Sequence, residues 1–124
     1  MSEFRQKPET KEWVIIATER AKRPDDFVKK HEDGSKKLPE HDPNCPFCPG
    51  NEAQTPPEVY SETMEGNWTL RVVPNKFAAL KSNLPPKRKR NGLFLKANGF
   101  GIAEVVIETP VHNKTIATME TFNK

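Results

Sequence analysis

Proline is the feature that most limits how this 124-residue chain can fold, because it occurs twelve times. Average usage would place about six prolines in a chain of this length. Each proline fixes the backbone angle φ and lacks the amide hydrogen that helices and central strands need. The sequence therefore excludes a helix bundle and favours extended segments joined by loops.

The supply of apolar residues is small for a self-contained domain. Apolar residues make up 34% of the chain, charged residues 30%, and the mean hydropathy is −0.80. Globular chains average about 45–50% apolar residues when glycine is included, so we expect this chain to bury only a small core of its own. No apolar run reaches the roughly 18–20 residues of a membrane span, and the N-terminus lacks the pattern of a secretory signal. We expect a soluble, cytoplasmic protein without a membrane partner.

The net charge of +3 is concentrated in one segment. Residues 81–90 contain five lysines and arginines and no acid, and the rest of the chain has 15 basic and 17 acidic residues. Such a run could bind nucleic acid or another polyanion. It could equally be a solvated loop between two strands. No stacking aromatic lies within the run, so we expect a loop and no nucleic-acid partner.

Four segments have the composition of β-strands. Residues 12–18, 68–73, 93–95 and 103–109 are rich in β-branched and apolar residues and are bounded by turn-forming residues. Residues 21–43 are polar and read as a loop. Helical periodicity is weak along the chain. These patterns predict a small, mainly antiparallel β-sheet with long loops.

The strongest chemical signal is the sequence Cys45-Pro46-Phe47-Cys48, which contains both cysteines of the chain. Two thiolates on a stiff turn suit a zinc ion. A redox pair would lie between a strand and the start of a helix, which the flanking sequence does not show. A disulfide is disfavoured without an export signal. We therefore favour zinc.

Zinc needs four ligands, and the remaining candidates are three histidines. His31 and His41 lie in polar loop sequence, where a solvated histidine is the commoner case. His112 follows the predicted strand 103–109, where a rigid element can aim it, although a turn histidine bonded to backbone has the same pattern. No choice of histidine supplies a convincing fourth ligand.

Two further segments carry side chains that can bind charged or polar groups. Arg20 and Arg23 could grip a diphosphate, although the same residues also suit a solvated basic turn. Asn75 follows Pro74 at the end of a predicted strand, and its amide could bind sugar hydroxyls or a base edge. An asparagine there is also an ordinary turn former.

Read together, five stretches resemble the amino-terminal portion of the galactose-1-phosphate uridylyltransferases, which belong to the histidine-triad superfamily. They occur in the family's order and cover essentially the whole chain. The stretches are residues 12–24, 45–52, 55–58, 68–80 and 104–112. Ala103 departs from the family, because many relatives have a histidine at this position.

The resemblance implies an α+β, histidine-triad-like fold, with residues 1–124 as the amino-terminal part of one domain and no second domain. It implies that Cys45, Cys48 and His112 bind zinc, with the fourth ligand beyond this chain. It also implies a set of substrate contacts. These are Arg20, Arg23, Gln54, Asn75 and Lys76.

The resemblance further implies a homodimer that transfers UMP between UDP-glucose and hexose 1-phosphate through a uridylyl-histidine. The family's nucleophile lies in a His-Pro-His motif, which this chain lacks. We therefore expect no catalytic residue here and an inactive isolated chain. Two alternatives remain open: an ADP-glucose phosphorylase-type nucleotidylyltransferase, and a non-catalytic binding module held together by zinc.

Overall fold

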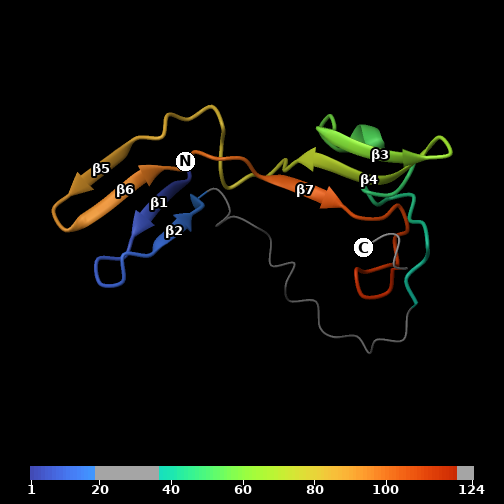
Figure 1. Ribbon diagram of the computed structural model, residues 1–124, viewed down its shortest axis with the longest axis horizontal. Helices are drawn as coiled ribbons and strands as arrows, with labels where there is room; N and C mark the ends of the chain where they lie inside the picture. The colour runs from blue at the N-terminus through green and yellow to red at the C-terminus, as the bar shows by residue number, and fades with distance from the viewer. Residues whose placement is uncertain (19–36, 120–124) are drawn as a thin grey trace. The chain divides into compact units, whose positions relative to one another are not determined.

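The computed structural model describes residues 1–18 and 37–119 of the chain (Figure 1). The chain divides into two compact units, each built from two separate stretches of sequence. The first unit combines Met1–Lys30 with Phe77–Ala103, and the second combines His31–Lys76 with Glu104–Lys124. Each unit contains one antiparallel sheet.

The sheet of the first unit has the strand order β2-β1-β6-β5. Its strands are β1 (Glu3–Gln6), β2 (Trp13–Ile16), β5 (Arg88–Asn91) and β6 (Phe94–Asn98). All of its strand pairs are antiparallel. Gly99 directly follows strand β6, and a Cβ added there would lie 2.6 Å from the backbone oxygen of Ser2. The Gly99 N–H donates a hydrogen bond to that same oxygen, so only glycine fits this close approach.

The sheet of the second unit has the order β3-β4-β7. Its strands are β3 (Tyr60–Met64), β4 (Asn67–Pro74) and β7 (Glu104–Ile107). Glu65 and Gly66 join β3 to β4 with positive φ angles of 53° and 82°, the backbone of a tight hairpin turn. In the central strand β4, Arg71 and Val73 are buried. They lie on one face because side chains alternate along a strand.

The prediction of a mainly antiparallel β structure is confirmed, and β2, β4, β6 and β7 lie within or overlap the four predicted segments. Strands β1, β3 and β5 were not predicted. The expectation that residues 81–90 form only a loop is wrong for residues 88–90, because they belong to β5, which pairs with β6 as an exposed edge strand. An edge strand needs no apolar face of its own, so its composition gives little signal.

Helix contributes little to the described residues. The one helical element whose bounds fall within them is the three-residue 3-10 turn η2 (Glu52–Gln54). The α+β class and the long loops are therefore not confirmed, and most of the predicted loop 21–43 lies outside the described residues. No helix in the described residues has the length and apolar character needed to cross a membrane.

Candidate metal centre and its supporting network

The cysteine segment of the second unit folds as consecutive tight turns. The backbone N–H of Cys45 donates to the Asp42 carbonyl (3.1 Å), and the N–H of Cys48 donates to the Cys45 carbonyl (3.2 Å). The N–H of Asp42 also donates to the Cys48 sulfur (3.4 Å). Both thiols are free. The prolines of this segment limit its conformations, so the turns hold the two sulfur atoms close together.

His112 comes to this segment from the other stretch of the second unit, just after β7. Its backbone N–H donates to the carbonyl of Glu40 (2.8 Å), and the Asn113 side chain donates to the carbonyl of Leu38 (3.2 Å). These bonds fasten the residues that precede the cysteine segment to the residues that follow β7. As a result, Nδ1 of His112 lies 3.4 Å from Sγ of Cys48.

The three side chains have the geometry of a partial zinc site. One ligand atom from each of Cys45, Cys48 and His112 lies within 4.8 Å of the others. In a tetrahedral site the zinc bond lengths place a sulfur and a nitrogen ligand about 3.5 Å apart, close to the separation of Cys48 and His112. Burial raises the pKa of the Cys48 thiol above its ordinary value, and a bound cation would offset that effect by stabilising the thiolate. The donor set therefore fits zinc.

His41, the other histidine near the cysteines, does not join this group. Its Nε2 lies 2.9 Å from the carbonyl oxygen of Pro49, which can only accept a hydrogen bond, so Nε2 carries the proton. The side chain of Asn51 adds two more bonds, to the carbonyls of Pro43 and Cys45 (2.9 and 2.8 Å). His41 and Asn51 thus brace the turns from outside, as residues around metal ligands commonly do.

A second network starts at Glu52, immediately after the cysteine segment. Its carboxylate accepts the backbone N–H of Gly50 on both oxygens (3.0 and 3.1 Å) and the indole N–H of Trp68 (3.0 Å). The backbone N–H groups of Glu52 itself and of Gly50, followed by the Trp68 indole, hold the pKa of Glu52 below its usual 4.5. Glu52 thereby attaches the metal segment to strand β4.

Arg71 continues this network along β4 and is almost fully buried (3% exposed). Its Nε pairs with Glu58 (2.8 Å), and one terminal nitrogen lies 3.3 Å from the Thr55 hydroxyl. The guanidinium also lies 5.6 Å from the centre of the Trp68 ring. Its Nη1 is buried without a hydrogen-bond partner. Arg71 therefore connects β4 to the segment between η2 and β3.

The low pKa of Glu52 gives the second unit a specific pH dependence. A carboxyl group whose pKa is lower in the folded state stabilises the fold above its unfolded pKa and loses that contribution as the pH falls through the folded pKa. With EDTA present to exclude metal effects, we expect Glu52→Gln to lower the free energy of unfolding at about pH 6. We expect this difference from the unmodified chain to become smaller as the pH falls to about 3. Urea titrations across this range measure the effect. A difference that stays constant with pH would contradict it, and Glu9→Gln, at an exposed position, is the matched control.

The structure places some of the predicted substrate residues. Gln54 is exposed in the turn η2, which directly follows the cysteine segment. Asn75 and Lys76 come directly after β4, so all three belong to the second unit. Arg20 and Arg23, and the candidate ligand His31, lie outside the described residues. The roles of the five predicted substrate residues stay predictions.

Sequence reasoning missed the supporting residues. Arg71 lies on the same strand face as Thr69 and Val73, and the other face of the strand is the more apolar one in the sequence, so the burial of Arg71 had no clear signal. Glu52, Trp68 and His41 had no local signal either, because their partners are distant in sequence or are backbone atoms.

Comparison with known proteins agrees with this arrangement. Residues 1–123 match the family model described as galactose-1-phosphate uridyl transferase, N-terminal domain. The chain belongs to the galactose-1-phosphate uridyl transferase family. The resemblance noted in the sequence is thereby confirmed, and this family includes enzymes of nucleotidyl transfer and phosphorolysis.

Several family members are similar over nearly the whole chain. An ADP-glucose phosphorylase of Arabidopsis thaliana is 37% identical over 121 residues, which are 95% of this chain and 34% of the relative. A galactose-1-phosphate uridylyltransferase of Thermotoga maritima is 32% identical and aligns with 96% of this chain and 30% of its own length. A crystal structure of an ADP-glucose phosphorylase from Arabidopsis thaliana with bound ADP-glucose superposes with a TM-score of 0.50 at 32% identity, over 99% of this chain and 33% of that chain. This chain thus spans about a third of the length of the family members it matches.

Proposed function

We propose that this chain is the zinc- and nucleotide-binding part of an enzyme that transfers a nucleotidyl group to or from a sugar phosphate. The observation that carries the proposal is the convergence of Cys45, Cys48 and His112 from two separate stretches of a chain of this family. Residues 1–124 are then the amino-terminal part of a histidine-triad-like domain. A cytoplasmic homodimer is the form that we propose for the enzyme.

In this proposal Cys45, Cys48 and His112 hold the zinc ion, and its role is structural. When bound, zinc joins the turns of the cysteine segment to the residues that follow β7 and so stabilises the second unit. The donor set supports this role, because two thiolates and an imidazole are ligands that zinc prefers. The bracing by His41 and Asn51 supports it further.

The nucleotide sugar is proposed to contact five residues of this chain. Cationic side chains suit the phosphates, and amide side chains suit sugar hydroxyls or the edge of the base. Arg20, Arg23 and Lys76 would take the first role, and Gln54 and Asn75 the second.

The donor nucleotide is open between two candidates. The uridylyltransferase relatives make UDP-glucose and hexose 1-phosphate one candidate pair of substrates. ADP-glucose is the other, and the higher identity to the ADP-glucose phosphorylase (37% against 32%) supports it. We propose ADP-glucose as the donor to test first.

The chain supplies no nucleophile of the kind that a nucleotidyl-histidine intermediate requires. Its three histidines are followed by Glu32, Asp42 and Asn113, so none begins a His-Pro-His motif. We therefore propose that the chain binds the nucleotide sugar but does not turn it over.

Calorimetric titration of the zinc-loaded chain with ADP-glucose and UDP-glucose tests this function. We expect ADP-glucose to bind more tightly, and Asn75→Ala to weaken binding by about tenfold through the loss of one or two hydrogen bonds. Asn83→Ala, at an exposed position, is the matched control. Failure of both nucleotide sugars to bind at millimolar concentration would overturn the proposal, and tighter binding of UDP-glucose would reassign the donor.

A further inference from the structure

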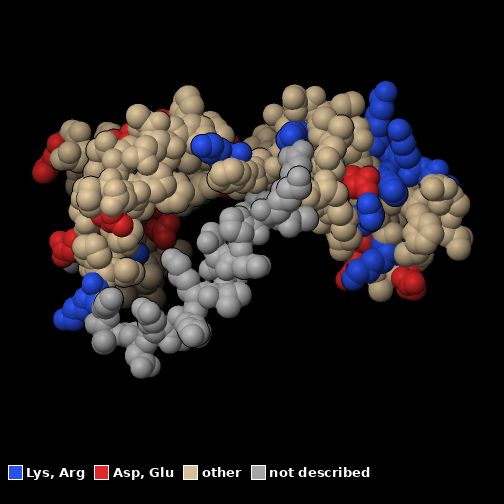
Figure 2. Space-filling view, turned by 180° about the vertical axis from the view of Figure 1, so that it is seen from behind, with Lys and Arg blue, Asp and Glu red and all other residues tan. Residues whose placement is uncertain are grey.

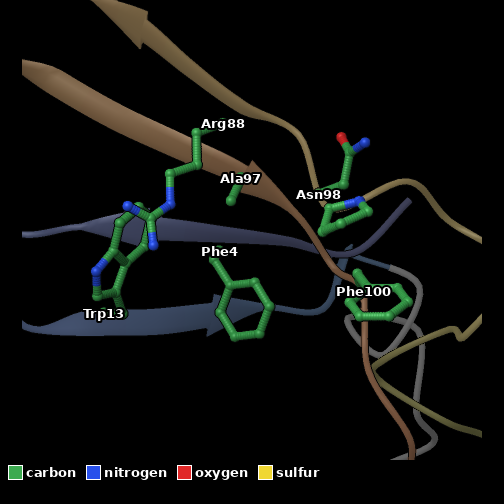
Figure 3. Close-up of a pocket in the computed structure, with 7 residues that line it drawn as sticks. Phe4, Trp13, Arg88, Ala97, Asn98 and Phe100 are labelled. Atoms are coloured by element: carbon green, nitrogen blue, oxygen red, sulfur yellow. The ribbon is translucent and has the colours of Figure 1, made fainter.

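One face of the first unit's sheet carries a pocket of about 330 Å³ (Figure 3). Three aromatic rings and one arginine dominate its lining. The lining residues are Phe4, Trp13, Pro86, Arg88, Ala97, Asn98 and Phe100. None of the residues proposed to bind zinc or the nucleotide sugar is among them, so the pocket calls for a separate explanation.

The strand register explains how these side chains meet. Phe4 pairs with Ala97, and Ala97 pairs with Arg88, which places the three residues on one face across β1, β6 and β5. Trp13 lies on β2, at the opposite edge of the sheet from β5. Strands β1 and β6 lie between β2 and β5. Arg88 and Trp13 nevertheless meet across them, because both side chains are long and the small Ala97 beside Arg88 leaves room.

Arg88 is held against Trp13 but is not neutralised by it. Its guanidinium lies 5.6 Å from the centre of the indole ring, and Figure 3 shows the two groups together at one end of the pocket. A guanidinium stacked on an aromatic face still has N–H groups at its edge for a bidentate anion. Within the described part of the chain, Arg88 has no carboxylate partner, and the pocket lining contains no acid.

Apart from Arg88, the pocket lining is apolar except for Asn98. The Asn98 side chain donates to the carbonyl of Pro85 (2.9 Å), which fixes the segment that carries Pro86. Phe100 stands at the other end of the pocket, directly after the close approach at Gly99, and Phe4 lies between the two ends (Figure 3). Phe100 is 43% exposed and Trp13 37% exposed, so both rings offer a face to a ligand.

We infer that this pocket binds a small anion that carries a flat aromatic ring. The ring packs against Phe4, Trp13 and Phe100, and the phosphate or carboxylate group of the ligand pairs with the edge of Arg88. The volume is near the lower end of ligand pockets, which favours a single ring system with one anionic group. Basic side chains also gather over the first unit (Figure 2), where β5 contributes exposed Lys89 and Arg90, and their field attracts anions.

Calorimetric titration of the chain with four probes tests this inference. Phenyl phosphate and benzoate combine a ring with an anion, inorganic phosphate lacks the ring, and phenol lacks the charge. We expect one or both of the first pair to bind at least about tenfold more tightly than either single-feature probe, because stacking and a charge-assisted pair each contribute. Which of the two binds better tells whether the site prefers phosphate or carboxylate.

Two substitutions in the pocket and one control substitution locate the binding. Arg88→Met should weaken phenyl phosphate or benzoate binding by about tenfold, whereas Arg90→Met should change it less than about twofold. Arg90 is the matched control, because it lies on the same strand and faces the same side without lining the pocket. Ala97→Leu fills the floor without altering charge and should also abolish binding, with circular dichroism confirming that the sheet is retained.

Three results would overturn the inference. The first is that no aromatic anion binds at millimolar concentration. The second is unspecific attraction of anions. It would be indicated by equal effects of Arg88→Met and Arg90→Met, or by tight binding of an oligonucleotide that both substitutions abolish. The third is a monomer–dimer equilibrium in sedimentation that depends on Trp13 and Arg88, which would assign the face to a second copy of the chain.

Discussion

Replacing Cys48 with serine is expected to abolish zinc binding by this chain. Cys48 is buried, its sulfur lies 3.4 Å from Nδ1 of His112, and it is one of the three clustered donors. A serine hydroxyl is a poor zinc ligand and cannot replace a thiolate. We expect the zinc content, measured by plasma mass spectrometry after dialysis, to fall from about one ion per chain, or one shared between chains, to less than about a tenth of that.

Two further variants separate ligation from support. Phe47→Ser changes an exposed residue of the same segment and should keep the zinc content of the unmodified chain. His41→Asn removes the bond to the Pro49 carbonyl and should weaken zinc affinity by about tenfold without removing the site. A chain purified without metal and with Cys45 and Cys48 bridged would contradict the zinc assignment, as would undiminished zinc in Cys48→Ser.

The second large effect is expected at Arg71. Truncation to alanine removes the pair with Glu58, the contact with Thr55, and the packing of a buried stem against Trp68. We expect Arg71→Ala to lower the free energy of unfolding by about 3 kcal/mol. That is a large share of the roughly 5–15 kcal/mol of a typical domain. Urea titration followed by tryptophan fluorescence measures it.

Arg71→Met distinguishes the charge from the packing. Methionine keeps much of the buried volume and removes the desolvation cost of the guanidinium, whose Nη1 has no partner, so we expect a loss of only about 1 kcal/mol. Arg90→Ala, on the exposed strand β5, should stay within about 0.5 kcal/mol of the unmodified chain. If Arg71→Ala cost no more than Arg90→Ala, the buried network would have no stabilising role.

The candidate metal centre shows how far local sequence can predict a site. The Cys-x-x-Cys spacing and its prolines fix a local turn, so Cys45 and Cys48 could be assigned without knowledge of the fold. Spacing alone left His112 as one of three candidate histidines, and only the family resemblance selected it. In the structure, the His112 backbone bonds to Glu40 and the neighbouring Asn113 bonds to Leu38. Those bonds join residues far apart in sequence, and no local pattern encodes them.

The pocket of the first unit shows the opposite case. The basic run was set aside as a binding site because it contains no aromatic residue of its own. The folded sheet supplies an aromatic residue from another strand. Trp13 of β2 contacts Arg88 of β5 across the face of the sheet. Strand pairing determines which distant side chains share a face, and the strands β1 and β5 were not predicted.

The twelve prolines excluded a helix bundle, and the four segments rich in β-branched and apolar residues predicted a mainly antiparallel β structure. Both signals are local, because they act on the backbone of each residue and on the period of neighbouring side chains. The cysteine spacing likewise determined half of a metal site. Only the tertiary structure decided that the chain forms two separate sheets, that His112 lies beside the two cysteines, and that the buried Arg71 pairs with Glu58. These features depend on contacts between segments that are distant in sequence. Such contacts form only when the packing and hydrogen bonds of the whole unit offset the entropy cost of closing the loops between the segments.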